Sequence, residues 1–481
     1  MKRSWLLLSS FVLPFLYYGC AVNPVSGNQD FVLMSENQEI AMGKRYNAEV
    51  LKQIPVYSDN ELQQYVQALG ESLAKNSHRS NLIYRFTVLD SPDVNAFALP
   101  GGYIFIYRGL MAYLSSEEEL AAVLGHELGH VTARHSVQQI SQSQLFDILT
   151  TIVGGVGGQS NSTAYNITNL AKGAFLAGYG RKLELQADEL GAEYMALDGY
   201  STEGMLKTLS VLKDQEVYSK EVSKRRGQTQ TYHGVFASHP KNDKRFQEVI
   251  SRAEVLKEDS SKDPVGNYLN KIEGLVFGDN EASGVRRGRD FYHSSLDLHL
   301  QAPKNWEIIN TSRRLIFSSP DGEGYLALEV EDQNMRESPR EYLKRNFSKN
   351  IYEAEDLLLD NYEASKTIIY SANERVRVAA VYKDRKVFTF IGRTRNFEKD
   401  FSSLDKGFVE IINSFSRLKN EEIPLSLPLR IRSYKVNQGD TYNSLSLRSP
   451  IPFDPEDKLR LLNGDYPNGK LTTGRTIKIV E

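Results

Sequence analysis

Three residues in the stretch Ala121–His135 have the types and spacing of a metal-dependent hydrolytic site. His126, Glu127 and His130 form the pattern His-Glu-x-x-His. On a helix, residues four apart share one face, so both imidazoles can reach one metal ion. Glu127 lies beside them, close enough to polarise a water molecule on that metal without being a ligand itself. The pattern therefore indicates zinc chemistry.

The alternative for this stretch is a pair of histidines packed in an ordinary protein core. A carboxylate between two imidazoles on an apolar helix costs desolvation free energy unless a charge pairs with it. That cost favours a metal site over a pair of histidines packed in a core. The apolar neighbours are Leu120, Val123, Leu124, Leu128 and Val131.

The sequence also predicts the elements that hold this motif. Ser116 is suited to cap the start of the helix, with Glu119 three residues later. Upstream, Asn95–Leu99 leads through a Pro-Gly-Gly turn into Tyr103–Tyr107, which is typical of a β-hairpin.

A second helix, from about Gly180 to Leu197, carries two acidic residues on one face. Glu184 and Asp188 are four residues apart, and like charges at that spacing repel. A cation beside them would relieve the repulsion. The alternative is an acidic stripe facing solvent, which the His-Glu-x-x-His motif makes less attractive.

Length and composition limit the remaining possibilities. A chain of 481 residues is expected to form two to four domains. Its formal charge of −3 gives no reason to expect a nucleic-acid partner. The single cysteine excludes an intramolecular disulfide and a cysteine-based zinc site.

The N-terminal residues 1–20 have the pattern of an export signal. Lys2 and Arg3 precede an apolar run that ends before Gly19 and Cys20. This junction resembles a bacterial lipoprotein processing site, although Tyr17 departs from it, and an ordinary secretory signal is the alternative. A lipidated Cys20 would anchor an exported, periplasmic protein to a membrane. Ala21, the residue after it, favours the outer membrane.

The C-terminal half changes character after a polar linker at Lys257–Pro264. Residues 285–420 alternate between strand and helix patterns without a catalytic cluster, which predicts an α+β domain. The expected strands are Leu296–Leu300, Leu326–Val330, Val376–Tyr382 and Val387–Gly392, and the expected helices are Arg340–Asn350 and Phe397–Phe415. Residues 429–481, through Tyr434–Thr441, Leu462–Gly464 and Leu471–Ile479, resemble a LysM module, a small fold that often binds cell-wall glycan, which implies peptidoglycan as a partner. Tyr442 and Ser449–Pro455 depart from the common pattern, and the alternative is a degenerate module that serves packing alone.

Several pieces of the sequence, taken together, resemble the M48 family of zinc metallopeptidases, in its soluble bacterial lipoprotein branch. They are Asn23-Pro24 with Gly27, Asn95–Gly102, the His-Glu-x-x-His motif, Glu184 with Asp188, and His239-Pro240. The resemblance covers about half of the chain. It implies that His126, His130 and Glu184 ligate one Zn²⁺ per chain and that Glu127 is the catalytic acid/base. It also implies that Asp188 orients a ligand histidine and that His239 stabilises the tetrahedral intermediate or fills the fourth zinc position.

The expected fold is multidomain α+β: a mainly helical zincin-type domain with a small sheet at 21–258, a linker at 259–284, the α+β domain at 285–420 and the LysM-like module at 429–481. Tyr103–Tyr107 resembles the edge strand that holds an extended substrate in this family.

The function implied is a zinc endopeptidase that cleaves unfolded or misassembled envelope proteins. One alternative is a gated or inactive scaffold or chaperone attached to the cell wall through 429–481. Another is a different zinc hydrolase such as an aminopeptidase.

Overall fold

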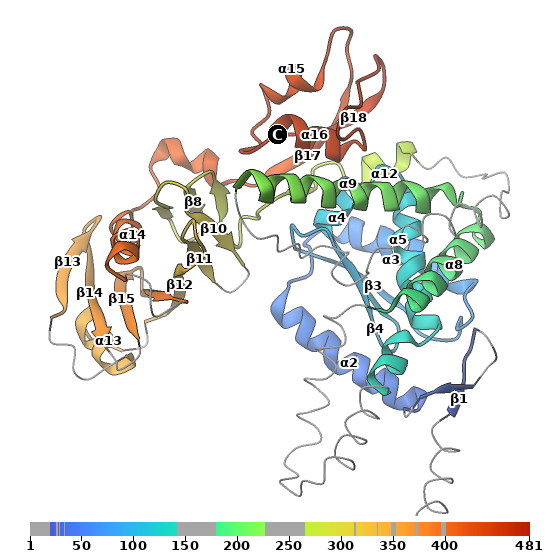
Figure 1. Cartoon of the computed structure of the whole chain (residues 1–481), viewed down its shortest axis with the longest axis horizontal. Coiled ribbons are helices and arrows are strands. Elements are labelled where there is room, and N and C mark those ends of the chain that lie inside the picture. The colour runs from blue at the N-terminus through green and yellow to red at the C-terminus, as the bar shows by residue number, and fades with distance from the viewer. Residues whose placement is uncertain are drawn as a thin grey trace, which may run out of the picture. The chain divides into compact units, whose positions relative to one another are not determined.

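The computed structural model describes residues 20–141, 179–226 and 265–481, apart from short gaps at 26, 28, 33, 312–313, 334, 348–352, 371–373 and 396–400. His239 and the linker predicted at Lys257–Pro264 lie outside these residues. The chain forms two compact units (Figure 1), which confirms a multidomain α+β protein. The first unit combines Met1–Leu275 with Ile431–Ser449 and Glu456–Glu481; the second comprises Val276–Arg430 and Pro450–Pro455.

A three-stranded sheet of order β3-β5-β4 lies at the centre of the first unit. β4 (Ala96–Leu99) runs antiparallel to β5 (Tyr103–Tyr107), so the predicted hairpin is confirmed. The prediction that Tyr103–Tyr107 is an edge strand is wrong, because β3 (Arg85–Leu89) pairs in parallel with its other side. β5 is therefore the central strand, buried along its whole length, and β4 is the edge strand that packs against the motif helix.

Helices cover both faces of this sheet (Figure 1). Alternate residues of β5 point to opposite faces, and Tyr103 and Phe105 pack with Met42 and Tyr46 of one helix. On the opposite face a second helix approaches so closely that a Cβ on Gly70 would lie 2.3 Å from the ring of Phe86. The helices of this unit are α2 (Glu36–Gln53), α3 (Asn60–Lys75), α4 (Arg108–Tyr113), α5 (Glu117–Thr132), α8 (Arg181–Leu197), α9 (Glu203–Arg226) and α12 (Val265–Lys271), and a short pair of strands precedes them, β1 (Cys20–Val22) and β2 (Gln29–Phe31).

The start and the end of α5 are fixed by different means. At its start, the Ser116 hydroxyl accepts a hydrogen bond from the backbone N–H of Glu119, so the predicted cap is confirmed. At its end, Arg134 has the left-handed φ of 60° that helix termini usually give to glycine. Its guanidinium donates to a carboxylate oxygen of Glu39 at 2.8 Å and to the backbone oxygen of Met34 at 3.0 Å.

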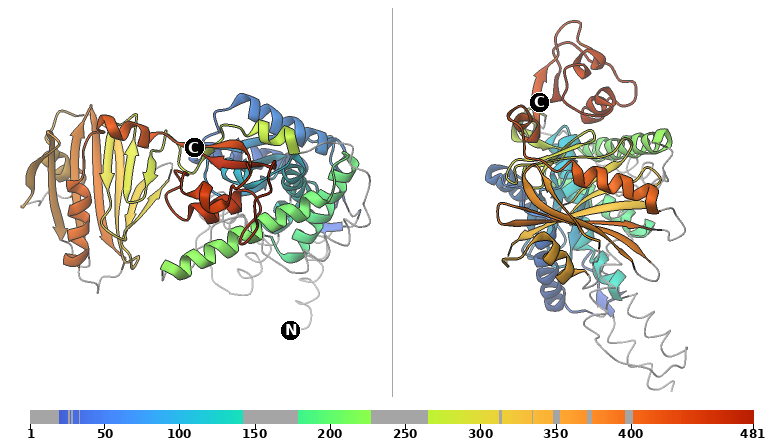
Figure 2. Two further views of the ribbon diagram at one scale, coloured as in Figure 1. Left: turned by 90° about the horizontal axis from the view of Figure 1, so that it is seen from above. Right: turned by 90° about the vertical axis from the view of Figure 1, so that its left-hand side faces the viewer.

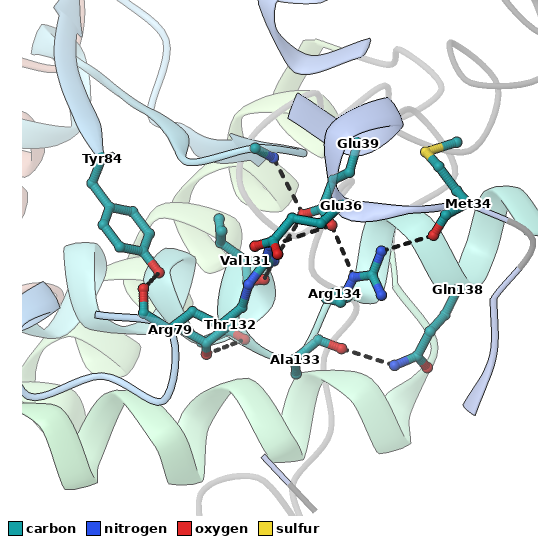
Figure 3. A network of polar contacts seen from close by, with 12 residues as sticks. Met34, Glu36, Glu39, Arg79, Tyr84, Val131, Thr132, Ala133, Arg134 and Gln138 are labelled. Carbon is teal, nitrogen blue, oxygen red and sulfur yellow. Dashed lines mark hydrogen bonds and ion pairs between the residues drawn. The ribbon is translucent and has the colours of Figure 1, made fainter. Parts of the chain in front are cut away.

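Glu39 is the centre of this network (Figure 3). Its buried carboxylate accepts hydrogen bonds from Arg79 at 2.8 Å, from Arg134, and from the backbone N–H of Gly101 at 3.3 Å. Arg79 also donates to the backbone oxygen of Val131, near the end of α5. One carboxylate thus connects α2, the end of the motif helix and the turn between β4 and β5.

The second unit is built on a seven-stranded antiparallel sheet of order β10-β11-β12-β16-β15-β14-β13. Along β15, Val378 packs with Leu343 of one helix, whereas Ala379 packs with Phe408 of another, so the two helices cover opposite faces (Figure 2). The strands of this sheet are β10 (Glu307–Asn310), β11 (Leu315–Ser318), β12 (Gly324–Asp332), β13 (Glu355–Leu359), β14 (Tyr362–Tyr370), β15 (Arg375–Lys383) and β16 (Lys386–Thr394), and the two helices are α13 (Pro339–Asn346) and α14 (Phe401–Asn413).

Each strand and helix predicted in this region overlaps an observed element, although several of their ends differ. The strand expected at Leu296–Leu300 begins only at Leu298, because Asp297 has a left-handed φ of 45° and closes a turn with Ser294. The remaining elements are β6 (Val276–Phe277), β7 (Val285–Arg287), β8 (Asp290–His293), β9 (Leu298–Gln301) and the 3-10 helix η1 (Asn420–Ser426).

The last residues of the chain form a small module with two strands and two helices. β17 (Leu429–Lys435) and β18 (Thr476–Val480) pair antiparallel, with Ile431 opposite Val480. Between them lie α15 (Tyr442–Ser446) and α16 (Pro455–Leu462). Most of this module belongs to the first unit, together with the motif helix.

The Glu39 network generates a stability prediction. We expect Glu39→Gln to lower the free energy of unfolding by about 3 kcal/mol, because it leaves buried guanidinium groups without their carboxylate. Glu36 is the matched control, since it also bonds Arg79 at 2.8 Å but its side chain is 62% exposed. Glu36→Gln should cost about 0.5 kcal/mol. Urea unfolding followed by circular dichroism measures both, and equal losses would contradict the assignment.

Candidate metal centre

Three of the predicted site residues meet at one point between α5 and α8. The Nε2 atoms of His126 and His130 lie 3.0 Å apart. One carboxylate oxygen of Glu184 lies 3.6 Å from Nε2 of His126, and the other lies 3.5 Å from Nε2 of His130. All three side chains are buried, and within the described part of the chain no other set of three His, Cys, Asp or Glu residues converges in this way.

The donor set fits a zinc ion. Ligand atoms about 2.1 Å from a tetrahedral zinc are roughly 3.3 Å from one another, close to the separations found here. Glu184 has no exposed surface, and a buried carboxylate needs a compensating positive charge. Two imidazoles and one carboxylate are the ligand types of catalytic zinc sites, which keep a fourth position for water or substrate.

The helices α5 and α8 cross close to each other (Figure 1). Glycine allows the close approach that forms this cluster. A Cβ on Gly129 would lie 2.8 Å from the backbone oxygen of Ala187. A Cβ on Gly191 would lie 2.9 Å from the backbone nitrogen of His126. Neither distance is compatible with a side chain, so larger residues would push α8 away and move Glu184 from the histidines.

Each imidazole is oriented through its other ring nitrogen. Nδ1 of His126 lies 2.8 Å from a carboxylate oxygen of Asp188, and because a carboxylate only accepts, this nitrogen carries the proton. Nδ1 of His130 lies 2.8 Å from Nδ1 of His135, whose Nε2 lies 3.1 Å from the amide oxygen of Gln186. Gln186 accepts from His135, and His135 in turn accepts from His130. Both Nε2 lone pairs therefore face the cluster.

Two further buried residues, Tyr179 and Glu127, lie close to the cluster. The ring of Tyr179 stacks on His130, with centroids 4.0 Å apart, and its hydroxyl lies 2.6 Å from that of Ser136. Burial raises the pKa of Tyr179, and the nearby carboxylates of Glu127 and Glu184 raise it further. Glu127, which is itself buried, thus lies close enough to interact electrostatically with the tyrosine ring that stacks on His130.

Sequence reasoning identified five of these residues and missed three. The missed residues support His130, and each had only a weak signal. His135 follows the motif by five residues, Gln186 is two residues beyond Glu184, and Tyr179 precedes the second helix. Nothing in the spacing alone reveals that a histidine and an amide orient a second histidine. His239, which was predicted near the metal, lies outside the described residues.

These contacts predict how zinc affinity depends on residues that do not touch the metal. We expect Asp188→Asn and His135→Phe each to weaken zinc binding about tenfold or more, because they remove the partners that fix the tautomer and orientation of a ligand. Glu189→Gln is the control, since Glu189 is exposed on the same helix. Competition with a chromogenic chelator measures the affinity. Unchanged affinity in Asp188→Asn would refute its orienting role.

Comparison with known proteins covers the region that contains this cluster. Residues 60–253 match the family model described as peptidase family M48. The β-barrel assembly-enhancing protease of Yersinia pestis is 29% identical over 242 residues, which are 49% of this chain and 48% of that protein. The protein of the same name from Escherichia coli is 24% identical over 326 residues, 63% of this chain and 65% of that protein.

A mitochondrial protein gives a third match. The mitochondrial metalloendopeptidase OMA1 of Arabidopsis thaliana is 31% identical over 150 residues, 31% of this chain and 30% of that protein. The chain thus spans about half to two thirds of the length of the two bacterial relatives. The matched region includes both helices that form the metal cluster. Residues 60–253 thus match peptidase family M48, and the relatives that share this region are named as a protease and a metalloendopeptidase.

Proposed function

We propose that this protein is a zinc-dependent endopeptidase. The observation that carries the proposal is the convergence of His126, His130 and Glu184 from two helices, all within 4.8 Å, in a chain that keeps Glu127 between the histidines. A general base has no use in a purely structural metal site. The donor set, its burial and the retained base together favour catalysis.

The residues of the chain would divide the reaction among them. His126, His130 and Glu184 would hold the zinc ion, which when bound lowers the pKa of water towards roughly 7 and polarises a carbonyl group. Glu127 would accept the proton of the attacking water and deliver it to the leaving amine. Asp188 and His135 would keep the two imidazoles in the orientation described above.

An extended substrate would bind along β4. Among the described strands, β5 occupies only one side of β4. β4 packs against α5, so a peptide added to its open side would run beside the motif helix. Main-chain pairing recognises the backbone before the side chains. We therefore expect cleavage within unfolded segments, which distinguishes this enzyme from an aminopeptidase.

The proposed location is supported by the N-terminal sequence pattern and by the names of the relatives. We propose export, acylation of Cys20 and anchoring at the outer membrane, with the peptidase acting in the periplasm. Among the described residues, no helix is both long and apolar enough to cross a membrane. Two relatives are named β-barrel assembly-enhancing proteases, which supports misassembled envelope proteins as the substrates.

Casein cleavage tests the proposal directly. We expect the mature protein to cut casein at internal bonds and Glu127→Gln to lose at least about a thousandfold in kcat while keeping one zinc per chain, because only the general base is removed. Bound zinc is counted in both proteins by elemental analysis. Glu184→Gln should lose the metal as well.

The other outcomes separate the alternatives. Release of single N-terminal residues without internal cleavage would indicate an aminopeptidase. Zinc in both proteins with no cleavage by either would indicate a gated enzyme or a scaffold, and His239→Ala would then test whether that histidine closes the site. Absence of zinc from the wild type would overturn the proposal.

A further inference from the structure

A fully buried lysine joins the C-terminal module to the helix that precedes the metal motif. Lys478 of β18 is only 1% exposed. Its ammonium donates hydrogen bonds to the backbone oxygens of Ala112, at 2.9 Å, and Leu114, at 2.5 Å. These two carbonyls lie at the end of α4, immediately before α5 begins.

The charge of this lysine is compensated by the corner that it contacts. The carbonyls at a helix C-terminus carry partial negative charge, which favours a cation. Glu119, in the first turn of α5, also attracts the ammonium, while burial lowers the pKa of Lys478 and raises the pKa of Glu119. A buried amine without such partners would be strongly unfavourable. The corner between α4 and α5 therefore supplies the partners that the buried ammonium of Lys478 requires.

Within the module, a buried asparagine side chain holds the backbone of Lys478. Asn463, itself buried, accepts a hydrogen bond from the backbone N–H of Lys478 at 2.7 Å. Its amide nitrogen donates to the backbone oxygen of Lys478 at 2.9 Å. This two-way contact fixes the backbone of β18 at the residue whose side chain makes the bridge.

Two other contacts attach the module to the same unit. The hydroxyl of Tyr466 donates to Glu221 of α9 at 2.7 Å, and its ring meets that of Tyr218 edge-on with centroids 6.0 Å apart. The backbone N–H of Ile431 donates to Leu275 at 2.8 Å, and the N–H of Gly274 donates to Ile431 at 2.9 Å. The attachment is thus distributed over three segments of the first unit.

We infer that the partner of the C-terminal module is the peptidase domain of the same chain, and that Lys478 is a positioning residue for the start of α5. His126 lies nine residues beyond Glu117, about 14 Å along the helix axis. A shift at the α4–α5 corner would be transmitted along this rigid element to the metal ligands. The inference about docking is independent of the proposed peptidase activity; only its effect on turnover rests on it.

Hydrogen exchange on the full-length mature protein tests the inference. Lys478→Met keeps the aliphatic stem and removes the charge, and Lys470→Met, at an exposed lysine of the same module, is the control. We expect Lys478→Met to raise exchange at residues 108–120 about tenfold, with exchange in β15 and β16 unchanged. Lys470→Met should leave both regions at the wild-type rate.

Two further readouts separate positioning from general support of the fold. Zinc affinity, measured by chelator competition, should fall several-fold in Lys478→Met, and kcat for casein should fall while KM stays the same, because β4 is not displaced. A milder variant, Tyr466→Phe, keeps the ring and removes the bond to Glu221, and should raise exchange in α9 by a smaller factor.

Two results would overturn the inference. The first is wild-type exchange at residues 108–120 in Lys478→Met together with wild-type exchange in α9 of Tyr466→Phe. The second is a rise in exchange at 108–120 when purified peptidoglycan is added to the wild type, which would make cell-wall glycan the partner and show that it displaces the module. A loss of casein cleavage in the wild type, with the exchange pattern as expected, would refute the proposed function alone.

Discussion

The burial of charge between α5 and α8 is the constraint on which the first unit depends. Glu184 and Asp188 have almost no exposed surface, and both face imidazoles that are buried as well. Carboxylates in such a place are stable only with protons, hydrogen-bond donors or a cation near them. Asp188 accepts a hydrogen bond from Nδ1 of His126 at 2.8 Å, and the two carboxylate oxygens of Glu184 lie 3.6 Å and 3.5 Å from Nε2 of His126 and Nε2 of His130. A divalent cation among His126, His130 and Glu184 would place positive charge beside the buried carboxylate of Glu184, and the fold brings the ligand atoms of all three residues within 4.8 Å of one another.

A metal cluster of this kind needs its two helices fixed to within a fraction of an ångström, and the contacts at both ends of α5 supply that rigidity. At its C-terminal end, Glu39 joins Arg79, Arg134 and the turn before β5. At its N-terminal end, Lys478 and the Ser116 cap define where the helix starts. The same carboxylate of Glu39 also contacts Gly101, beside the strand proposed to bind substrate. One buried carboxylate therefore contacts both the turn that follows β4 and the residue that follows the end of the motif helix.

Local patterns predicted the parts of this arrangement that lie close together in sequence. The His-Glu-x-x-His helix, its Ser116 cap, the β4–β5 hairpin and the acidic helix could all be predicted from spacing within about twenty residues. The order of the sheet could not, because β3 joins β5 in parallel, and such pairing leaves no turn signal. One signal was nevertheless available: five apolar residues in succession at Tyr103–Tyr107 are typical of a strand buried on both faces, not of an edge. The bonds from Glu39 to Arg134, 95 residues apart, and from Lys478 to Ala112, 366 residues apart, had no local signature at all.

The first unit is built from segments that are far apart in the sequence, and it can form one compact body because the ends of the inserted segment lie next to each other. Val276–Arg430, which forms most of the second unit, is inserted between Leu275 and Ile431. The backbone N–H of Ile431 donates to the oxygen of Leu275, and the N–H of Gly274 donates to the oxygen of Ile431. Within the second unit, Val276 pairs with Arg430 and Phe277 with Leu429, so the ends of the inserted segment are also adjacent. An insertion whose ends meet adds a long loop without stretching the host, and the entropic cost of closing such a loop grows only slowly with its length. The final strand of the chain can for this reason return to the α4–α5 corner, where Lys478 donates hydrogen bonds to the backbone oxygens of Ala112 and Leu114.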